Sequence, residues 1–243
     1  MSEKFQFTDY NGPMWELLQE LNPVQVFEFE GMDLSDLNNF KIGNEDCFLR
    51  CYKADKIEKI TISKMNFYGG MMAGGTVICP AEDYDLPTFS SDWDESEDHL
   101  HGIIDFIPAD DPGRNAEYLK TYLYEPLEEL YKKYCRIPGL QPNVFYWVRA
   151  FQSPYMLTGH IKQVENGKYV QEFFKCSQEY LKKWIELWKK AERKDPNSDY
   201  MKLVKQRRKN IRETYRYNDP GEGPLTKVLG AERARKILNT LMP

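Results

Sequence analysis

The sequence lacks most of the motifs that mark common enzyme chemistries. It contains no glycine-rich dinucleotide-binding or phosphate-binding motif, no HExxH zinc motif and no GxSxG nucleophile motif. Its 3 histidines are too few for a histidine-rich metal site. It also has no run of about 18 apolar residues, which a membrane-spanning helix needs. We therefore expect no bound nucleotide, flavin or metal cofactor in the chain, and no membrane span.

Cysteine is sparse and is arranged without the spacing of a disulfide framework. The 5 cysteines are an odd number, which suits a reducing compartment. Cys47 and Cys51 share one face of a predicted strand, but no second pair follows at the spacing of zinc ligands, so two buried thiols are expected. The first residues have no targeting character. The sequence thus predicts a cytoplasmic protein, or one of the plastid stroma if a transit peptide has been removed.

Charge is distributed unevenly along the chain. The net charge is −5, yet the segment 182–216 holds 13 Lys and Arg against 5 Asp and Glu, a local charge of +8. A basic helical face of this kind is either an ordinary solvated surface or a docking site for an acidic partner. No helix-turn-helix, zinc-finger or RNP signature accompanies it, and the acidic remainder of the chain repels phosphate. Nucleic-acid binding is therefore the least favoured interpretation.

The hydrophobic pattern changes from strands to helices near the middle of the chain. A short amphipathic helix is expected at 8–21, followed by strands at 24–31, 47–54, 59–67 and 99–108, with a turn and a further strand within 69–80. Helical periods follow at 116–134, where Pro126 should kink or restart the helix, at 169–194 and at 225–242. Consecutive strands joined by short turns predict a mostly antiparallel sheet. The absence of a long linker predicts a single domain, 1–243.

The strand at 99–108 carries a carboxylate on an otherwise apolar register. Because side chains alternate along a strand, His99, His101 and Asp105 share one face, and an apolar set occupies the other. If the polar face is wet, Asp105 is an ordinary solvated carboxylate. If that face lines a pocket, Asp105 loses hydration, its pKa rises, and it can hold a proton near neutral pH. The strand pattern alone leaves both interpretations open.

Three ordered stretches resemble motifs of the ferredoxin-dependent bilin reductases. They are the Pro-x-Phe-x-x-Asp turn in "DYDLPTFSSDW" at 83–93, the central strand in "IIDFIPADDP" at 103–112, and the Asp-Pro-x-x-Gly helix start in "NDPGEGPLTKVLGAERARKIL" at 218–238. A weaker match is "FQSPYMLTGHI" at 151–161. The resemblance implies a three-layer α/β/α sandwich, a central antiparallel β-sheet flanked by helices, which the order of strands and helices permits. It also implies that substrate lies between the sheet and the C-terminal helices.

The same resemblance implies roles for particular residues. Asp105 matches the family's proton-donating aspartate, and Asp219 matches a partner carboxylate on the opposite wall. Ser153, and Phe89 of the Pro-x-Phe-x-x-Asp stretch, are expected to contact the substrate. The family usually has an arginine some residues after its Ser-Pro pair; here His160 follows, while Arg149 precedes. Either one is expected to hold a propionate of the bilin, although Arg149 could equally be a surface strand residue and His160 a histidine at the edge of the core.

The implied reaction is the reduction of a linear tetrapyrrole by single electrons from an external acidic ferredoxin that docks on the basic segment 182–216 of a monomer. The expected product is phycoerythrobilin, formed from biliverdin or 15,16-dihydrobiliverdin. The resemblance implies this product because the phycocyanobilin-forming branch of the family has a histidine near the "DLPTF" turn, and this sequence has none there. Reductases that form other bilins, and a non-catalytic bilin carrier of the same fold, are the alternatives. Two inward carboxylates favour catalysis, since they would only destabilise a carrier.

Overall fold

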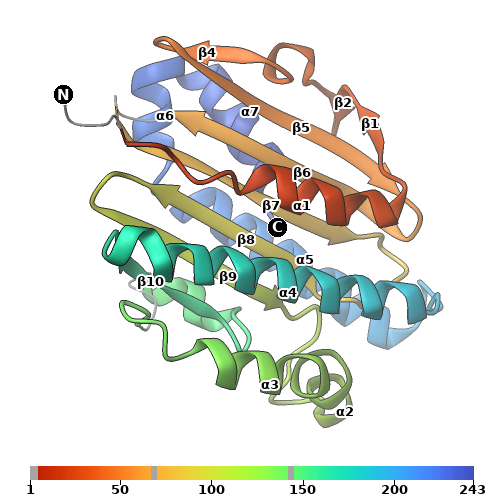
Figure 1. Cartoon of the computed structure of the whole chain (residues 1–243). Helices are drawn as coiled ribbons and strands as arrows, with labels where there is room; N and C mark the ends of the chain where they lie inside the picture. The colour runs from red at the N-terminus through yellow and green to blue at the C-terminus, as the bar shows by residue number, and fades with distance from the viewer. Residues whose placement is uncertain (1–4, 67–69, 142–144) are drawn as a thin grey trace.

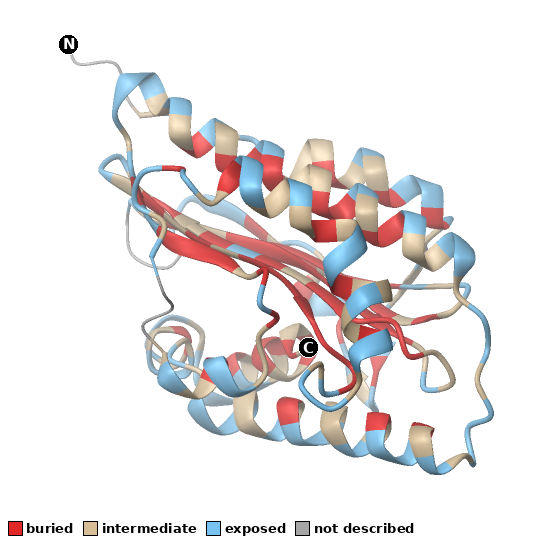
Figure 2. Ribbon diagram, turned by 90° about the horizontal axis from the view of Figure 1, so that it is seen from below, coloured by how far each residue is buried: buried red, intermediate tan, exposed pale blue. Residues whose placement is uncertain are grey.

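A central antiparallel sheet lies between two layers of helices in this computed structural model, which describes residues 5–66, 70–141 and 145–243 (Figures 1 and 2). The strand order is β1-β5-β6-β7-β8-β9-β10, and β4 pairs with β5. The strands are β1 Val24–Val26, β4 Phe40–Ile42, β5 Glu45–Ala54, β6 Ile57–Asn66, β7 Met72–Pro80, β8 Thr88–Glu95, β9 His99–Ile107 and β10 Leu157–Lys162. The three-layer architecture predicted from the sequence is confirmed.

The predicted strand at 24–31 is interrupted. The structure divides it into β1 and β2 (Glu28–Phe29), and β2 pairs with β3 (Met32–Asp33) in a separate two-stranded sheet. The turn between β2 and β3 uses positive φ angles, 47° at Glu30 and 76° at Gly31. An alternating pattern does not reveal such a turn when its residues continue the alternation.

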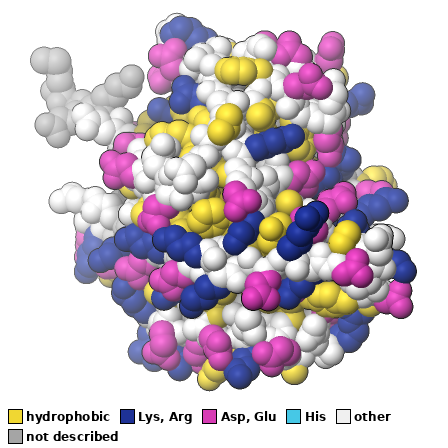
Figure 3. Space-filling view, turned by 90° about the vertical axis from the view of Figure 1, so that its right-hand side faces the viewer, with side chains coloured by type: hydrophobic (Ala, Val, Ile, Leu, Met, Phe, Trp, Pro, Cys, Tyr) yellow, Lys and Arg dark blue, Asp and Glu magenta, His cyan; other side chains and the backbone are white. Residues whose placement is uncertain are grey.

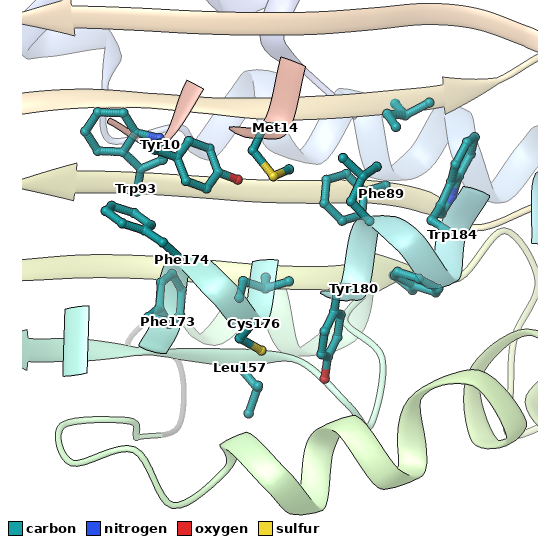
Figure 4. Close-up of a cluster of buried hydrophobic side chains, with 14 of the residues drawn as sticks. Tyr10, Met14, Phe89, Trp93, Leu157, Phe173, Phe174, Cys176, Tyr180 and Trp184 are labelled. Atoms are coloured by element: carbon teal, nitrogen blue, oxygen red, sulfur yellow. The ribbon is translucent and has the colours of Figure 1, made fainter. Parts of the chain in front are cut away.

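One face of the sheet is covered by α1 (Asn11–Leu18) and α4 (Lys168–Lys190), which enclose a dry aromatic core (Figure 4). The aromatic stripe expected on the helix at 169–194 is buried there, with Phe173 and Trp184 among its members. Gly102 of β9 lets α4 approach closely, because a Cβ atom at this position would lie 2.3 Å from the Phe173 ring. Trp184 Nε1 donates a hydrogen bond to the carbonyl of Pro87 at 2.8 Å, so the indole is satisfied inside the core.

The opposite face is covered by α5 (Asp199–Asn218), α6 (Glu222–Leu229) and α7 (Ala231–Leu241) (Figures 1 and 2). The helix predicted at 225–242 is divided into α6 and α7 at Gly230, whose φ of 82° favours glycine. The buried amine of Lys59, on β6, donates to the carbonyls of Thr240 at 2.9 Å and Met242 at 2.6 Å. This lysine therefore fastens the end of α7 to the sheet.

The remaining helical segments pack around these layers. The predicted helix at 116–134 contains a π-helical segment just before Pro126, so the expected irregularity is present. The segments are α2 Ala116–Tyr118, η3 Leu119–Tyr124 and α3 Glu125–Tyr134, with 3₁₀ turns η1 Gln19–Leu21, η2 Ser35–Leu37, η4 Tyr146–Ala150 and η5 Glu165–Gly167. Within the described ranges, no helix is long and apolar enough to cross a bilayer.

Candidate active site

A cavity of about 340 Å³ lies between the sheet and the C-terminal helices. Its floor is formed by β6, β7, β8 and β9, and its roof by η4, the end of α5, α6 and α7. The side chains of the floor are small over the central strands, where Ser63 of β6 and Ala73 of β7 line the cavity. Apolar and aromatic side chains such as Ile103 and Trp147 contribute most of the rest of the lining. This lining suits a largely apolar ligand.

Asp92 projects from β8 into this cavity. It is paired across the sheet with Ile103 of β9, so both side chains share the cavity face. The side chain is exposed to the open space of the cavity, but protein surrounds that space. Burial, together with the negative charges of Asp94 and Asp219, raises the pKa of Asp92 to about 7, while His101 opposes the rise. Asp92 can therefore hold a proton at neutral pH.

Asp94 and His101 form a pair beside Asp92. They are direct cross-strand partners, and His101 Nδ1 lies 3.1 Å from Asp94 Oδ2. Burial alone would lower the pKa of His101, but the hydrogen bond to Asp94 and the charges of Asp94 and Asp92 outweigh it, and the pKa is raised. His160 of β10 stacks on His101 with ring centroids 4.7 Å apart, and burial and the neighbouring histidines lower its pKa. The pair places a proton-exchanging group at the cavity.

Asp219 lines the cavity from the roof, opposite the sheet. It follows the last residue of α5, and its Oδ1 accepts a hydrogen bond from the N–H of Gly221 at 2.7 Å. Burial raises the pKa of Asp219, although the Gly221 bond acts against this. One turn earlier, Tyr215 also lines the cavity and packs edge-to-face against Trp147 at 4.8 Å. A carboxyl group thus faces the ligand space from each wall.

Asp105 lies on the cavity face of β9 but is almost fully covered. Its side chain is 2% exposed and is not part of the cavity lining. Ser153 holds both carboxylate oxygens: its N–H donates to Oδ2 at 3.0 Å and its hydroxyl to Oδ1 at 2.5 Å. Burial outweighs these hydrogen bonds and raises the pKa of Asp105 to about 6. The solvated-carboxylate interpretation of Asp105 is therefore wrong.

The other predicted contact residues lie at varied places. Ser153 is buried against Asp105 and does not line the cavity. His160 is exposed on the edge strand beside His101. Arg149 is exposed in the 3₁₀ turn η4, not in a strand, and its guanidinium lies 5.6 Å from the centroid of the Tyr146 ring.

Phe89 lies on the other face of the sheet from the cavity. It is 0% exposed in the dry core, where its ring packs against Phe106 at 6.3 Å. The stretch 83–93, expected to be a turn, enters strand β8 at Thr88. Because side chains alternate along a strand, Asp92, three residues after Phe89, points to the opposite face and into the cavity. The Pro-x-Phe-x-x-Asp motif therefore contains a signal for Asp92, because its aspartate and its phenylalanine stand an odd number of residues apart on one strand.

The described residues also bear on metal and thiol chemistry. Among residues 5–66, 70–141 and 145–243, no group of three or more His, Cys, Asp or Glu could hold a metal ion. All five cysteines are free thiols. Cys47 and Cys51 are buried, as predicted. What the site gathers is a set of carboxyl groups with raised pKa values around an apolar space, which is an acid–base site.

Solved structures of two other proteins resemble this one. The structure matches phytochromobilin synthase from tomato in complex with biliverdin with a TM-score of 0.80 at 16% identity, over 96% of this chain and 84% of that chain. It matches a protein named PcyX with a TM-score of 0.52 at 14% identity, over 94% of this chain and 93% of that chain. No curated protein matches the sequence. Likeness at these identities establishes the fold.

The family follows from the sequence itself. The pattern that defines the ferredoxin-dependent bilin reductases matches residues 18–242, nearly the whole chain. The chain belongs to the ferredoxin-dependent bilin reductase family. It is therefore an oxidoreductase of that family, whose members take electrons from ferredoxin, and the prediction made from the three motifs is confirmed.

Proposed function

We propose that this protein reduces biliverdin or 15,16-dihydrobiliverdin towards phycoerythrobilin, taking electrons from ferredoxin and protons from aspartates around the cavity. The observation that carries the proposal is the placement of Asp92 and Asp219 on opposite walls of one cavity, with Asp105 buried on the same face of the sheet as Asp92, each with a raised pKa. The tomato relative of the same fold was solved with biliverdin bound, which supports a bilin as the ligand.

The chemistry requires protons to arrive in step with electrons. Each reduced double bond takes up two electrons and two protons, and ferredoxin delivers its electrons singly. Each added electron makes the conjugated bilin more basic, so a nearby acid must protonate it before the next electron arrives. Carboxyl groups with pKa values of about 6 at Asp105 and about 7 at Asp92 carry protons near neutral pH. Ionised surface carboxylates would not.

The two walls allow protonation from both sides of a flat ligand. Asp219 approaches from the end of α5, while Asp92 approaches from β8 across the ligand space. We assign Asp105 to the sheet-side acid together with Asp92, and Asp219 to the second acid. The apolar lining, which includes Tyr215 and Trp147, limits the access of water to radical intermediates.

The propionates of the bilin extend towards the rim of the cavity in this proposal. In the part of the chain that the structure describes, the cavity lining includes no Lys or Arg. A propionate buried among Asp92, Asp94 and Asp219 would be repelled by like charge. Arg149 in η4, which adjoins the lining residue Val148, and His160 remain the proposed cationic partners at the edge.

Ferredoxin is proposed to dock on the basic segment 182–216. The structure pairs much of this charge internally: Arg193 with Asp83 at 2.5 Å and Arg212 with Glu30 at 2.9 Å. Figure 3 shows the side of the molecule that lies on the right in Figure 1, where Lys and Arg side chains are interspersed with Asp and Glu. Lys182 and Lys190 on α4 are exposed and have no acidic partner within the described ranges. The docking face therefore depends on fewer cations than the segment's charge of +8 indicates.

The proposal is tested by incubating the purified protein with biliverdin, or with 15,16-dihydrobiliverdin, in the presence of reduced ferredoxin. The visible spectrum follows the reaction, and chromatography identifies the product. Phycoerythrobilin is the expected product from both substrates. Another reduced bilin would correct the product, and a bilin that binds but stays unchanged would contradict catalysis.

A further inference from the structure

Ser153 separates two hollows of the molecule. On one side it holds Asp105, which lies on the cavity face of β9. On the other side it lines an outer recess of about 360 Å³ together with Gln141, Gln152 and Thr158. The recess and the bilin cavity have no lining residue in common. Ser153 itself is 1% exposed, so it forms part of the wall between them.

The hydrogen bonds of Ser153 orient its hydroxyl proton towards Asp105. The hydroxyl donates to Asp105 Oδ1 at 2.5 Å and accepts the N–H of Tyr155 at 3.0 Å. A serine oxygen has two acceptor positions, so one remains for a donor from the recess. Within the described ranges, Gln152 Oε1 is a buried oxygen of the recess without a hydrogen-bond partner, which a water molecule there would satisfy.

Asp105 needs a proton source other than the ligand cavity. The carboxyl is 2% exposed, and a bound bilin fills the space through which water could approach from the cavity side. Once Asp105 has given its proton, it is a buried anion, and it must be protonated again before it can act a second time. Among residues 5–66, 70–141 and 145–243, the donors to its two oxygens are the N–H and hydroxyl of Ser153 and the backbone N–H of Phe106.

We propose that Ser153 is the proton inlet of Asp105, passing protons from water in the outer recess to the carboxylate. The hydroxyl proton moves to Oδ1 while a proton from recess water replaces it on Oγ. No electron moves, and the net change is the transfer of one proton from solvent to Asp105. Ser153 is thus a positioning and relay residue that does not touch the bilin. This inference rests on the proposed function of Asp105 as an acid.

This assignment differs from the substrate contact expected of Ser153. The N–H and the hydroxyl of the residue both donate to Asp105. A residue that binds substrate would change the affinity for bilin when it is replaced, whereas a proton relay changes the turnover of bound bilin and its pH dependence.

The decisive comparison is Ser153→Val against Ser153→Thr. The two side chains have the same shape, but only threonine keeps the hydroxyl. We expect Ser153→Val to lower kcat at least about tenfold, with the bilin affinity changed less than about twofold and an increased solvent deuterium isotope effect. Ser153→Thr should retain kcat. Because loss of a donor to the charged form raises the pKa of Asp105, the alkaline limb of the pH profile should move upward in Ser153→Val alone.

Equal kcat, pH profile and isotope effect in the two variants would overturn the proposal. If Ser153→Val does not fold, Ser153→Ala takes its place with the same expectations. Infrared titration of the Asp105 carboxyl, with Asp105→Asn to assign the band, tests the inlet without turnover: deuterium exchange should slow in Ser153→Val and not in Ser153→Thr. Unchanged exchange contradicts the inlet even if bilin is reduced. A wild-type protein that reduces no bilin but shows slowed exchange in the valine variant contradicts the proposed function instead.

Discussion

The two faces of strands β8 and β9 are built from the same alternating segments, yet they carry side chains of opposite kind. On the face towards α4, Ile104 and Phe106 are 0% exposed, and aromatic rings fill the space between sheet and helix (Figure 4). On the face towards α5, Asp92 and His101 line a cavity of about 340 Å³. Small residues hollow the floor on this side, whereas large ones close the other. One face stabilises the fold, and the other leaves space for a ligand.

Adjacent residues of these strands point to opposite faces, so residues that stabilise the core alternate with residues that line the cavity. Residues 103 and 104 are both isoleucine and are adjacent in the chain, but Ile103 lines the cavity and Ile104 lies in the dry core. The carboxyl groups of Asp92 and Asp105, whose pKa values are raised, lie on the cavity face. Substitutions on the cavity face should therefore act mainly on turnover or bilin binding, and substitutions on the dry face mainly on stability.

The largest expected effect is on turnover, from Asp105→Asn. Asparagine is nearly isosteric and the lining is untouched, so the variant should fold and bind bilin. It cannot donate a carboxylic proton, so turnover should fall by about 10²-fold or more, with a long-lived radical after the first electron. Asp219→Asn should accumulate a partly reduced bilin. Electron paramagnetic resonance during single-turnover reduction measures the radical.

The matched control for this prediction is Tyr10→Phe on the dry face. It removes a buried hydroxyl that donates to Ser91 Oγ at 2.5 Å, at a cost of about 1 kcal/mol in stability. Turnover should not change. An Asp105→Asn variant with wild-type product yield and no persistent radical would remove Asp105 from the mechanism.

The largest expected effect on stability comes from Ile104→Ala, compared with Ile103→Ala. Removing the buried Ile104 side chain leaves a cavity in a close-packed core and should lower the free energy of unfolding by about 3–4 kcal/mol. Ile103 already borders open space, so its replacement should cost about 1 kcal/mol and weaken bilin binding instead. Urea denaturation and bilin titration measure the two quantities. Equal losses of stability would show that the two faces are packed alike.

The pH dependence of stability should arise from the cavity face. The pKa of Asp105 rises from 3.8 to about 6 on folding, so the folded protein binds this proton more tightly than the unfolded chain. The free energy of unfolding therefore increases as the pH falls through about 6. It levels off below the pKa of 3.8 that Asp105 has in the unfolded chain, with a gain of about 2–3 kcal/mol. The pKa of Asp92, raised to about 7, and the raised pKa values of His101 and Asp219 act in the same direction.

Unfolding measured between pH 8 and pH 4 checks this expectation. Asp105→Asn should make the curve shallower, with the remaining slope carried by Asp92, His101 and Asp219. Tyr10→Phe should leave the slope unchanged, since burial raises the pKa of Tyr10 and keeps its hydroxyl neutral throughout this range. A variant curve parallel to that of the wild type would mean that Asp105 does not carry this titration.

The sequence predicted the dry face better than the cavity face, for a physical reason. Buried strands and the aromatic stripe of α4 obey regular periods that a sequence displays directly. The separation of α6 from α7 at Gly230 depends on one backbone angle. On the cavity face, the motifs located Asp105 and Asp219, but Asp92 was overlooked because its stretch was interpreted as a turn. The bond from Ser153 to Asp105 joins residues 48 positions apart, so it depends on how η4 and β10 return to the sheet.

The smallest expected effect comes from a substitution at Lys59, which attaches α7 to the sheet. On the dry side α4 is anchored by apolar packing, whereas the end of α7 is fastened by Lys59, whose amine donates to the carbonyls of Thr240 and Met242. Lys59→Met keeps the apolar stem but removes these charge-assisted hydrogen bonds, so we expect a loss of about 1–2 kcal/mol. Because Leu238 and Leu241 of α7 line the cavity, the variant should also bind bilin more weakly.

Hydrogen exchange should accelerate in α7 and remain slow in α4. Equal acceleration in both helices would mean that Lys59 supports the whole fold and not the cavity wall alone.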